Sequence, residues 1–336
     1  MQRILTVLLI AILAVGAVSA QDLTLRDVYT MLRAEQYDKA LEATNTLLKD
    51  DAKNDRLLGL KQYALEQLGK TEEVKALAGL RLDIVNAAIA EKGEDARNLG
   101  TKQGILVSLE RYEEAVKVAL KVDQMREKPS PWTAMGIVDI YIAMKDKANA
   151  FKWVDEAVSR GFNAFETFSE EDYALLQEDK ARLDGVVKRI KEEVIGLGKP
   201  AKDFTLTLID GGEFTLSAQK GKVVLVDFWA TWCGPCRQEM PHVKAVYDAN
   251  KDKGFEIIGI SLDRENDLEK LKTYVKENEL GWKFSFSGGF WQDATAKAWG
   301  VNSIPSVWLI DKKGVLRHFG VRGDELKTAV ETLLAE

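Results

Sequence analysis

The stretch Val223-Val-Leu-Val-Asp-Phe-Trp-Ala-Thr-Trp-Cys-Gly-Pro-Cys-Arg237 decides how the second half of this chain folds. It opens with an uninterrupted apolar run over 223–226, which is typical of a strand buried on both faces. Beyond Cys236, apolar residues recur at helical spacing, at Met240, Val243, Val246 and Tyr247. The two cysteines therefore lie where a buried strand passes into a helix.

This position favours reactive sulfur. A thiol at the start of a helix faces unpaired backbone N–H groups and the positive end of the helix dipole. Both favour the thiolate, which is the form that reacts. Cys233 is the residue so placed, and we expect it to be the attacking thiolate. Cys236, one turn further on, is near enough to close a small disulfide with it.

Cys233 and Cys236 are the only cysteines in 336 residues. A structural disulfide usually joins distant segments, because closing a long loop removes more entropy from the unfolded chain. A zinc site needs about four ligands, and the two histidines, His242 and His318, are not in a metal-type spacing. The pattern favours a redox-active dithiol that needs no other cofactor or metal, with a metal site or a passive disulfide as the alternatives.

The motif WCGPC after a VDFWA strand resembles the thioredoxin family, and its flanks resemble the exported TlpA/ResA-type branch. The resemblance covers about 200–336. It implies an α/β thioredoxin-like domain, with a central mixed sheet flanked by helices, that exchanges disulfides through a mixed disulfide with Cys236 as the resolving thiol. The dipeptide Gly234-Pro235 is that of reducing thioredoxins, and it indicates a reducing enzyme.

The resemblance also assigns residues outside the motif. Ile304-Pro305 matches the family's cis-proline, and Ile304 would pair with the substrate backbone. Asp227 lies in the apolar strand, where burial favours the neutral carboxyl, and the matching aspartate of thioredoxins takes the proton of the resolving thiol. The lysine that accompanies it there would fall near Gly259 and is missing here.

The substrate-facing residues follow from the same comparison. Trp232 is the expected surface for a substrate, together with Gly234, Pro235 and Ile304, whereas Trp229 is expected in the core. No further binding residue is indicated by the motif.

The first twenty residues are typical of a secretory signal peptide. Arg3 provides the positive start, an apolar run follows over 4–18, and small residues precede the expected cleavage before Gln21. The alternative is an uncleaved N-terminal membrane anchor. Export would place the mature chain in the periplasm or another extracytoplasmic compartment, where disulfides persist.

Residues 21–195 are expected to be all helical. A short motif opens a helix four times, at Tyr37, Thr71, Tyr112 and Ala148, at intervals of about 34–41 residues. The pattern resembles the second helix of a tetratricopeptide repeat, and it predicts stacked helical hairpins. Such hairpins could bind a partner protein or serve as a spacer or a dimerisation module.

A linker over 196–200 separates this part from the predicted domain over 201–336. There, alternating residues around Asp210-Gly-Gly212 predict a hairpin, and strands are expected over 255–262, near 283–286, over 302–311 and over 315–319. Asp324 is expected to cap the final helix. Lys plus Arg number 47 against 53 Asp plus Glu, a net charge of −6 without a basic patch, so nucleic acid is not an expected partner.

Three functions compete at this point. The favoured one is an exported thiol–disulfide oxidoreductase that reduces protein disulfides and receives electrons from a membrane thiol donor, as the resemblance implies. The second is an adaptor whose helical repeats bind a partner. The third is a peroxiredoxin-like peroxidase, which the spacing disfavours because Thr231 precedes Cys233 by two positions, and peroxiredoxins have three.

Overall fold

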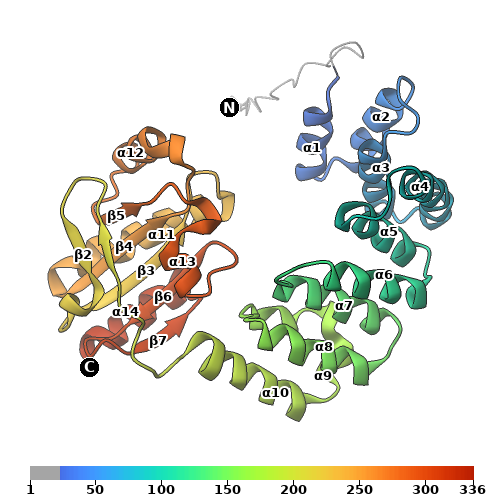
Figure 1. Ribbon diagram of the computed structural model, residues 1–336. Helices are drawn as coiled ribbons and strands as arrows, with labels where there is room; N and C mark the ends of the chain where they lie inside the picture. The colour runs from blue at the N-terminus through green and yellow to red at the C-terminus, as the bar shows by residue number, and fades with distance from the viewer. Residues whose placement is uncertain (1–22) are drawn as a thin grey trace, which may run out of the picture. The chain divides into compact units, whose positions relative to one another are not determined.

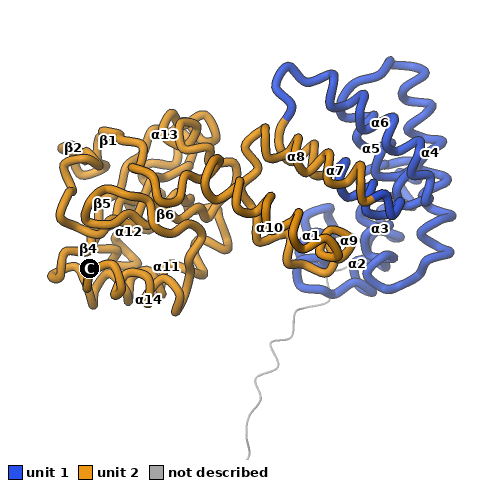
Figure 2. The backbone as a smooth tube through the Cα atoms, turned by 90° about the horizontal axis from the view of Figure 1, so that it is seen from below, with its two compact units in different colours: residues 1–129, 136–146 blue, residues 130–135, 147–336 orange. Residues whose placement is uncertain are grey.

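The computed structural model describes residues 23–336, so the predicted signal segment over 1–20 lies outside the described residues. The described chain divides into two compact units (Figure 2). One comprises 23–129 with 136–146, and the other 130–135 with 147–336. This division falls inside the helical region, and the predicted domain junction over 196–200 stays a prediction. In the described part, no helix is both apolar enough and long enough to cross a lipid bilayer.

The helical region consists of helices that pack consecutively in the first unit (Figure 1). These are α1 (Leu25–Arg33), α2 (Tyr37–Leu47), α3 (Asp55–Gln67), α4 (Thr71–Lys92), α5 (Ala96–Ser108) and α6 (Tyr112–Gln124). They are followed by α7 (Pro131–Ala143) and α8 (Lys147–Ser159). Each of the four predicted motifs starts at the first or second residue of an even-numbered helix. The predicted helical hairpins are therefore confirmed. Their identity as tetratricopeptide repeats stays a prediction.

The turns inside these hairpins share one geometry. The residue two positions before each even-numbered helix has a left-handed backbone: Glu35 (φ 56°), Gly69 (φ 68°), Glu110 (φ 58°) and Lys145 (φ 57°). The next residue in each turn donates its N–H to a carbonyl five positions earlier, at 2.9–3.0 Å. This bond closes a Schellman-type helix end, so the four turns are structural repeats although only one of them uses glycine.

Small residues let the hairpin helices approach closely. Ala40 and Ala115, three positions after the tyrosines that open α2 and α6, are fully buried. Val74 takes the same place in α4. In α8 the corresponding residue is Phe151, which is also fully buried. The position is therefore buried in all four hairpins, but a small or β-branched side chain occupies it in only three.

The part of the chain that follows α8 is helical, as predicted, but irregular. Between 165 and 195 the structure has five short segments. They are η1 (Phe165–Ser169), η2 (Glu171–Tyr173), α9 (Ala174–Gln177), α10 (Lys180–Arg189) and the π-helical η3 (Ile190–Ile195). Gly196, with φ 87°, ends the last of them in a left-handed conformation, as glycine at a helix end commonly does.

The C-terminal part is built on a five-stranded mixed sheet of order β5-β4-β3-β6-β7 (Figure 1). Its strands are β3 (Val223–Trp229), β4 (Phe255–Ser261), β5 (Lys283–Phe286), β6 (Ser306–Ile310) and β7 (Leu316–Phe319). The strands β3, β4 and β5 are parallel, and β6 and β7 are antiparallel to their neighbours. The predicted hairpin is present as β1 (Thr205–Thr207) and β2 (Glu213–Thr215). This is the predicted thioredoxin-like fold.

Helices cover both faces of this sheet, and Figure 2 shows α11 (Gly234–Asn250) and α14 (Gly323–Ala335) on one side with α13 (Ala294–Ala298) on the other. The helix α12 (Leu268–Glu277) adds Tyr274, whose ring lies 5.5 Å from that of Trp229. All residues of β3 and β4 are buried, as parallel strands covered on both faces should be. The predicted cap was wrong: Arg322 is the N-cap of α14, and Asp324 lies in its first turn.

Gly259 is the residue that faces Asp227 across the β3–β4 pair. A Cβ atom at this position would lie 2.6 Å from the ring of Phe284 and 3.1 Å from Nε1 of Trp229. These aromatic rings fill the space that a longer side chain would need. The lysine that thioredoxins have near this place is therefore excluded here by packing.

We expect Gly259→Ala to lower the free energy of unfolding by about 1–3 kcal/mol, because the added methyl overpacks a rigid aromatic cluster. The measurement is the urea midpoint followed by tryptophan fluorescence. Gly185→Ala in α10 is the matched control, since a Cβ there meets nothing within 4 Å, and it should raise stability by about 0.4–1 kcal/mol. Equal midpoints for both variants would contradict this account of Gly259.

Candidate active site

Cys233 and Cys236 form a disulfide at the junction of β3 and α11. Cys233 is the N-cap of α11, and its sulfur accepts a hydrogen bond of 3.2 Å from the N–H of Cys236. Pro235 lies in the first turn, where a missing N–H leaves no helical bond unmade. The predicted junction of strand, dithiol and helix is therefore present.

The disulfide is only slightly accessible. Cys233 is 4% exposed and Cys236 3%, so both residues are buried. Of the other residues predicted to face a substrate, Trp232 and Pro235 are exposed, and Gly234 and Ile304 are half-buried. Trp229 is fully buried, as expected for a core residue.

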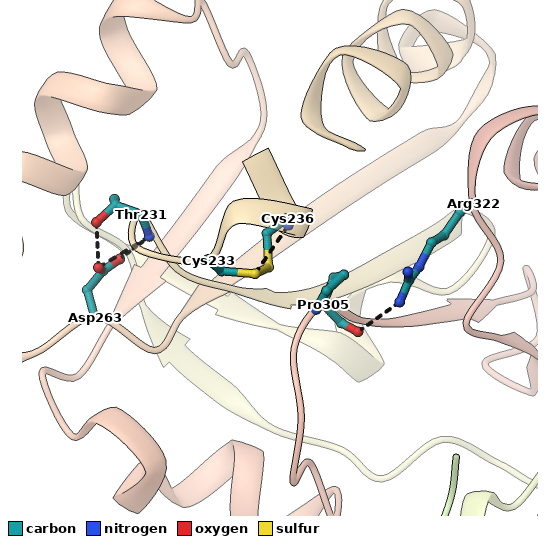
Figure 3. The surroundings of a disulfide bond; sticks show 6 residues. All are labelled: Thr231, Cys233, Cys236, Asp263, Pro305 and Arg322. Atoms are coloured by element: carbon teal, nitrogen blue, oxygen red, sulfur yellow. Dashed lines mark hydrogen bonds between the residues drawn. A yellow bond between two sulfur atoms is a disulfide. The ribbon is translucent and has the colours of Figure 1, made fainter. Parts of the chain in front are cut away.

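A buried carboxylate holds the loop that leads to Cys233 (Figure 3). Asp263 follows β4 and is fully buried. It accepts hydrogen bonds from the Thr231 hydroxyl at 2.6 Å, the Thr231 N–H at 3.0 Å and the Ser261 hydroxyl at 2.7 Å. These hydrogen bonds satisfy a buried polar group, and they fix the backbone two residues before Cys233.

The loop before β6 lies on the other side of the disulfide in Figure 3. The Ile304–Pro305 peptide bond is cis, as predicted. The carbonyl of Pro305 faces Nη2 of Arg322 at 3.5 Å. Pro305 itself has no N–H, so it leaves the nearby sulfur without a hydrogen-bond donor from this residue.

Asp227 is buried in the middle of β3, as predicted, with 4% of its surface exposed. Its Oδ1 has no hydrogen-bond partner among the described residues. Burial raises the pKa of Asp227 to about 7, the positive charge of Arg322 opposes this shift, and the negative charge of Glu239 adds to it. The carboxyl can therefore change its protonation state near neutral pH.

Glu239 links the reactive helix to the C-terminal helix. It belongs to α11, and its Oε1 accepts a hydrogen bond of 2.6 Å from the N–H of Gly323 in the first turn of α14. A carboxylate at a helix N-terminus is favourable because it meets the positive end of the dipole. The bond therefore holds α11 and α14 together beside Arg322.

Three structural contributors were missed in the sequence: Asp263, Glu239 and Arg322. Asp263 could have been suspected, because it directly follows the buried strand next to the one that carries the cysteines. Neither Glu239 nor Arg322 stands in a recognisable pattern. In the part of the chain that the structure covers, no group of three or more His, Cys, Asp or Glu side chains is placed to hold a metal ion.

The arrangement has the parts that thiol–disulfide chemistry requires. It has two sulfurs that can join or separate, a helix N-terminus that favours a thiolate, and a carboxyl that titrates near neutral pH. Comparison of the sequence with known proteins identifies the family.

The AhpC/TSA family matches residues 197–319. A thiol-disulfide oxidoreductase ResA of Bacillus thuringiensis subsp. konkukian is 37% identical over 145 residues, which are 43% of this chain and 80% of that protein. The ResA of Geobacillus kaustophilus is 32% identical over 141 residues, 42% of this chain and 78% of the relative.

Two solved structures are also similar to part of this chain. The thioredoxin domain of a thiol-disulfide oxidoreductase from Bacteroides vulgatus is 33% identical, with a TM-score of 0.38 over 41% of this chain and 97% of that domain. A protein described as a putative protein disulfide isomerase from Bacteroides thetaiotaomicron is 34% identical, with a TM-score of 0.38 over 43% of this chain and 92% of the other. On the identity and coverage of its relatives, the chain belongs to the family of ResA-like thiol-disulfide oxidoreductases and is an oxidoreductase.

Proposed function

We propose that the protein reduces disulfides in other exported proteins through the dithiol of Cys233 and Cys236. The observation that carries this proposal is the disulfide at the N-terminus of α11, where a backbone N–H is directed at the Cys233 sulfur. That N–H and the helix dipole would stabilise a thiolate at Cys233 once the disulfide is reduced.

The reaction proceeds in two exchanges. The Cys233 thiolate attacks one sulfur of the client disulfide, so a mixed disulfide forms and the other client sulfur leaves as a thiolate. The Cys236 thiol then loses its proton and attacks Cys233, which forms the Cys233–Cys236 disulfide and releases the second client sulfur. Two electrons pass from the protein to the client, and each released client thiolate takes up a proton.

Asp227 is the proposed acceptor of the Cys236 proton, directly or through water. A base with a pKa near the working pH accepts a proton and gives it up again with little loss of driving force. The raised pKa of Asp227, about 7, suits this role. The positive charge of Arg322 opposes the raised pKa of Asp227. A lysine could not take this role from position 259, because Phe284 and Trp229 fill the space beside Gly259.

The cycle requires a reductant outside the cytosol. If the predicted signal segment directs export, a membrane protein that carries electrons as thiols would return the Cys233–Cys236 disulfide to the dithiol. A dithiol donor of this class supplies two electrons and two protons for each disulfide that the protein reduces. The periplasm or another extracytoplasmic space is the proposed location.

The peroxidase alternative is disfavoured by Thr231. Its hydroxyl donates to Asp263 at 2.6 Å and is turned away from the two sulfurs in Figure 3. A threonine hydroxyl engaged in this way does not help to bind a peroxide at Cys233.

Because Cys233 is the proposed attacking residue and Cys236 the resolving one, their serine variants should behave differently. Pre-reduced wild type should reduce insulin disulfides, and Cys233→Ser should reduce none. Cys236→Ser should instead accumulate a mixed disulfide with the client, because no second thiol releases it. Non-reducing gel electrophoresis shows this adduct, which added dithiothreitol should dissolve. An adduct on Cys233→Ser and none on Cys236→Ser would reverse the assignment.

The proposed direction predicts the reduction potential of the Cys233–Cys236 couple. Proline at position 235 adds no positive charge that would over-stabilise the thiolate, so we expect a value near that of thioredoxin, about −270 mV. Equilibration with glutathione or dithiothreitol buffers measures it. A value close to that of DsbA, about −120 mV, would mark the protein as an oxidant.

The burial of Asp227 predicts that Asp227→Asn slows the reaction but makes the folded protein more stable at pH 8. Removing the base should slow release of the mixed disulfide by about 100-fold at pH 7 and abolish the rate increase between pH 6 and 8. The folded carboxyl binds its proton up to a pKa of about 7, against 3.8 as the ordinary value. As pH rises from about 4 to about 7, wild type therefore loses up to about 4 kcal/mol of folding stability, and the variant should not.

Stopped-flow tryptophan fluorescence and urea unfolding at pH 4.5 and pH 8 provide the two measurements. Asp263→Asn is the matched control, because that carboxylate accepts bonds from Thr231 and Ser261, and its loss should destabilise the protein at pH 8. If Asp227→Asn is also less stable than wild type at pH 8, the carboxyl is not a strained buried acid.

A further inference from the structure

Trp232, Phe290 and Trp291 form a contiguous group of rings next to the disulfide, called here the aromatic platform. Ring centroids are 5.5 Å apart for Trp232 and Phe290, 6.3 Å for Trp232 and Trp291, and 5.8 Å for Phe290 and Trp291. Trp232 immediately precedes Cys233 and is 41% exposed, and the other two are half-buried. The platform therefore presents one exposed ring and two partly exposed rings beside Cys233.

The loop that carries Phe290 and Trp291 is packed tightly against the chain that follows β4. Gly288 has φ 70°, and a Cβ atom there would lie 2.8 Å from Cα of Glu265. Gly289 pairs with Arg264 in an antiparallel bridge. The Ser287 hydroxyl donates to Asp293 at 2.7 Å, which closes the loop at its base. The two glycines therefore let the loop lie directly on the chain that follows β4.

Phe290 is held in a conformation that a bulky residue rarely adopts. Its φ is 51°, in the left-handed region, where a side chain of this size is unfavourable. Such conformations persist where the surroundings impose them, and they concentrate at ligand-binding sites. Here the result of the unfavourable backbone is that the Phe290 ring lies against Trp232.

A positive charge lies on the platform. The guanidinium carbon of Arg264 is 4.7 Å from the centroid of the Phe290 ring, within the range of a cation–π contact. Arg264 is exposed, so its contact with the ring fixes a side chain that would otherwise be free in water. Ring faces and a planar cation are the groups against which another aromatic ring packs best.

We propose that the aromatic platform binds a client segment that carries an aromatic side chain next to its disulfide cysteine, and that it thereby sets the client preference of Cys233. The inference rests on the proposed reductase function. When a client sulfur is joined to Cys233, the residues beside the client cysteine must lie over the surface next to Cys233, and Trp232 provides that surface. Phe290 and Trp291 extend it by two rings.

Two synthetic peptides test this. Each carries one intramolecular disulfide, and they differ only at the residue before one cysteine, which is phenylalanine in one and serine in the other. The second-order rate constant for reduction by the pre-reduced protein is measured for each. Wild type should favour the phenylalanine peptide about fivefold. Phe290→Ser and Trp291→Ser should each bring this ratio towards one.

Two further variants complete the test, one as a control and one that moves the loop. Leu80→Ser changes an exposed leucine of α4, which is 47% exposed, and should keep the wild-type ratio. Gly288→Ala keeps every ring but displaces the loop, so it should lower the ratio as Phe290→Ser does. Both rate constants are measured on the same preparation, so their ratio does not depend on how much of the protein is inactive.

The outcomes separate the two proposals. If wild type reduces both peptides at equal rates, or if Phe290→Ser and Gly288→Ala keep the wild-type ratio, the aromatic platform does not select clients, and the reductase proposal stands. If wild type reduces neither peptide, the proposed function itself fails.

Discussion

The hydrogen bond from the Cys236 N–H to the Cys233 sulfur is the interaction on which this site depends. It exists because β3 ends at Trp229 and α11 begins at Gly234, so the chain must turn within a few residues and present an unpaired helix N-terminus. The burial of β3 on both faces fixes the position of that end. Asp263 then holds Thr231, so the sulfur occupies a defined place relative to the helix.

The same burial that makes the strand rigid creates the unusual chemistry of Asp227. A carboxyl in the middle of a buried strand is costly when ionised, and one of its oxygens has no partner among residues 23–336. A hydrophobic residue there would make the sheet more stable. The positive charge of Arg322 opposes the raised pKa and so offsets part of this cost.

Much of this could be predicted because the signals were local. The run over 223–229 and the Cys233–Cys236 spacing fixed the strand, the helix and the disulfide, and the resemblance supplied the cis bond at Pro305. What failed or was missed depends on contacts between distant segments. Asp324 has the right residue type for a cap, but Arg322 takes that position, where the chain between β7 and α14 places it.

The loop with Phe290 shows the same limit. Its sequence, Gly288-Gly289-Phe290-Trp291, has no helical or strand period, so pattern analysis predicts no element there. Its contacts with Arg264 and Trp232 appear only in the folded structure, because these residues are 26 and 58 positions away from Phe290 in sequence. A contact of that kind cannot be read from either segment alone.

The four hairpin turns at Glu35, Gly69, Glu110 and Lys145 have a consequence of another kind. Because each turn lies inside a hairpin and follows the same backbone path, every hairpin carries its own closing turn. The segments that join one hairpin to the next differ in length, over 48–54, 93–95 and 125–130. A gene that gained or lost one hairpin would therefore keep the turn within it, but would have to supply a new join to the neighbouring hairpin.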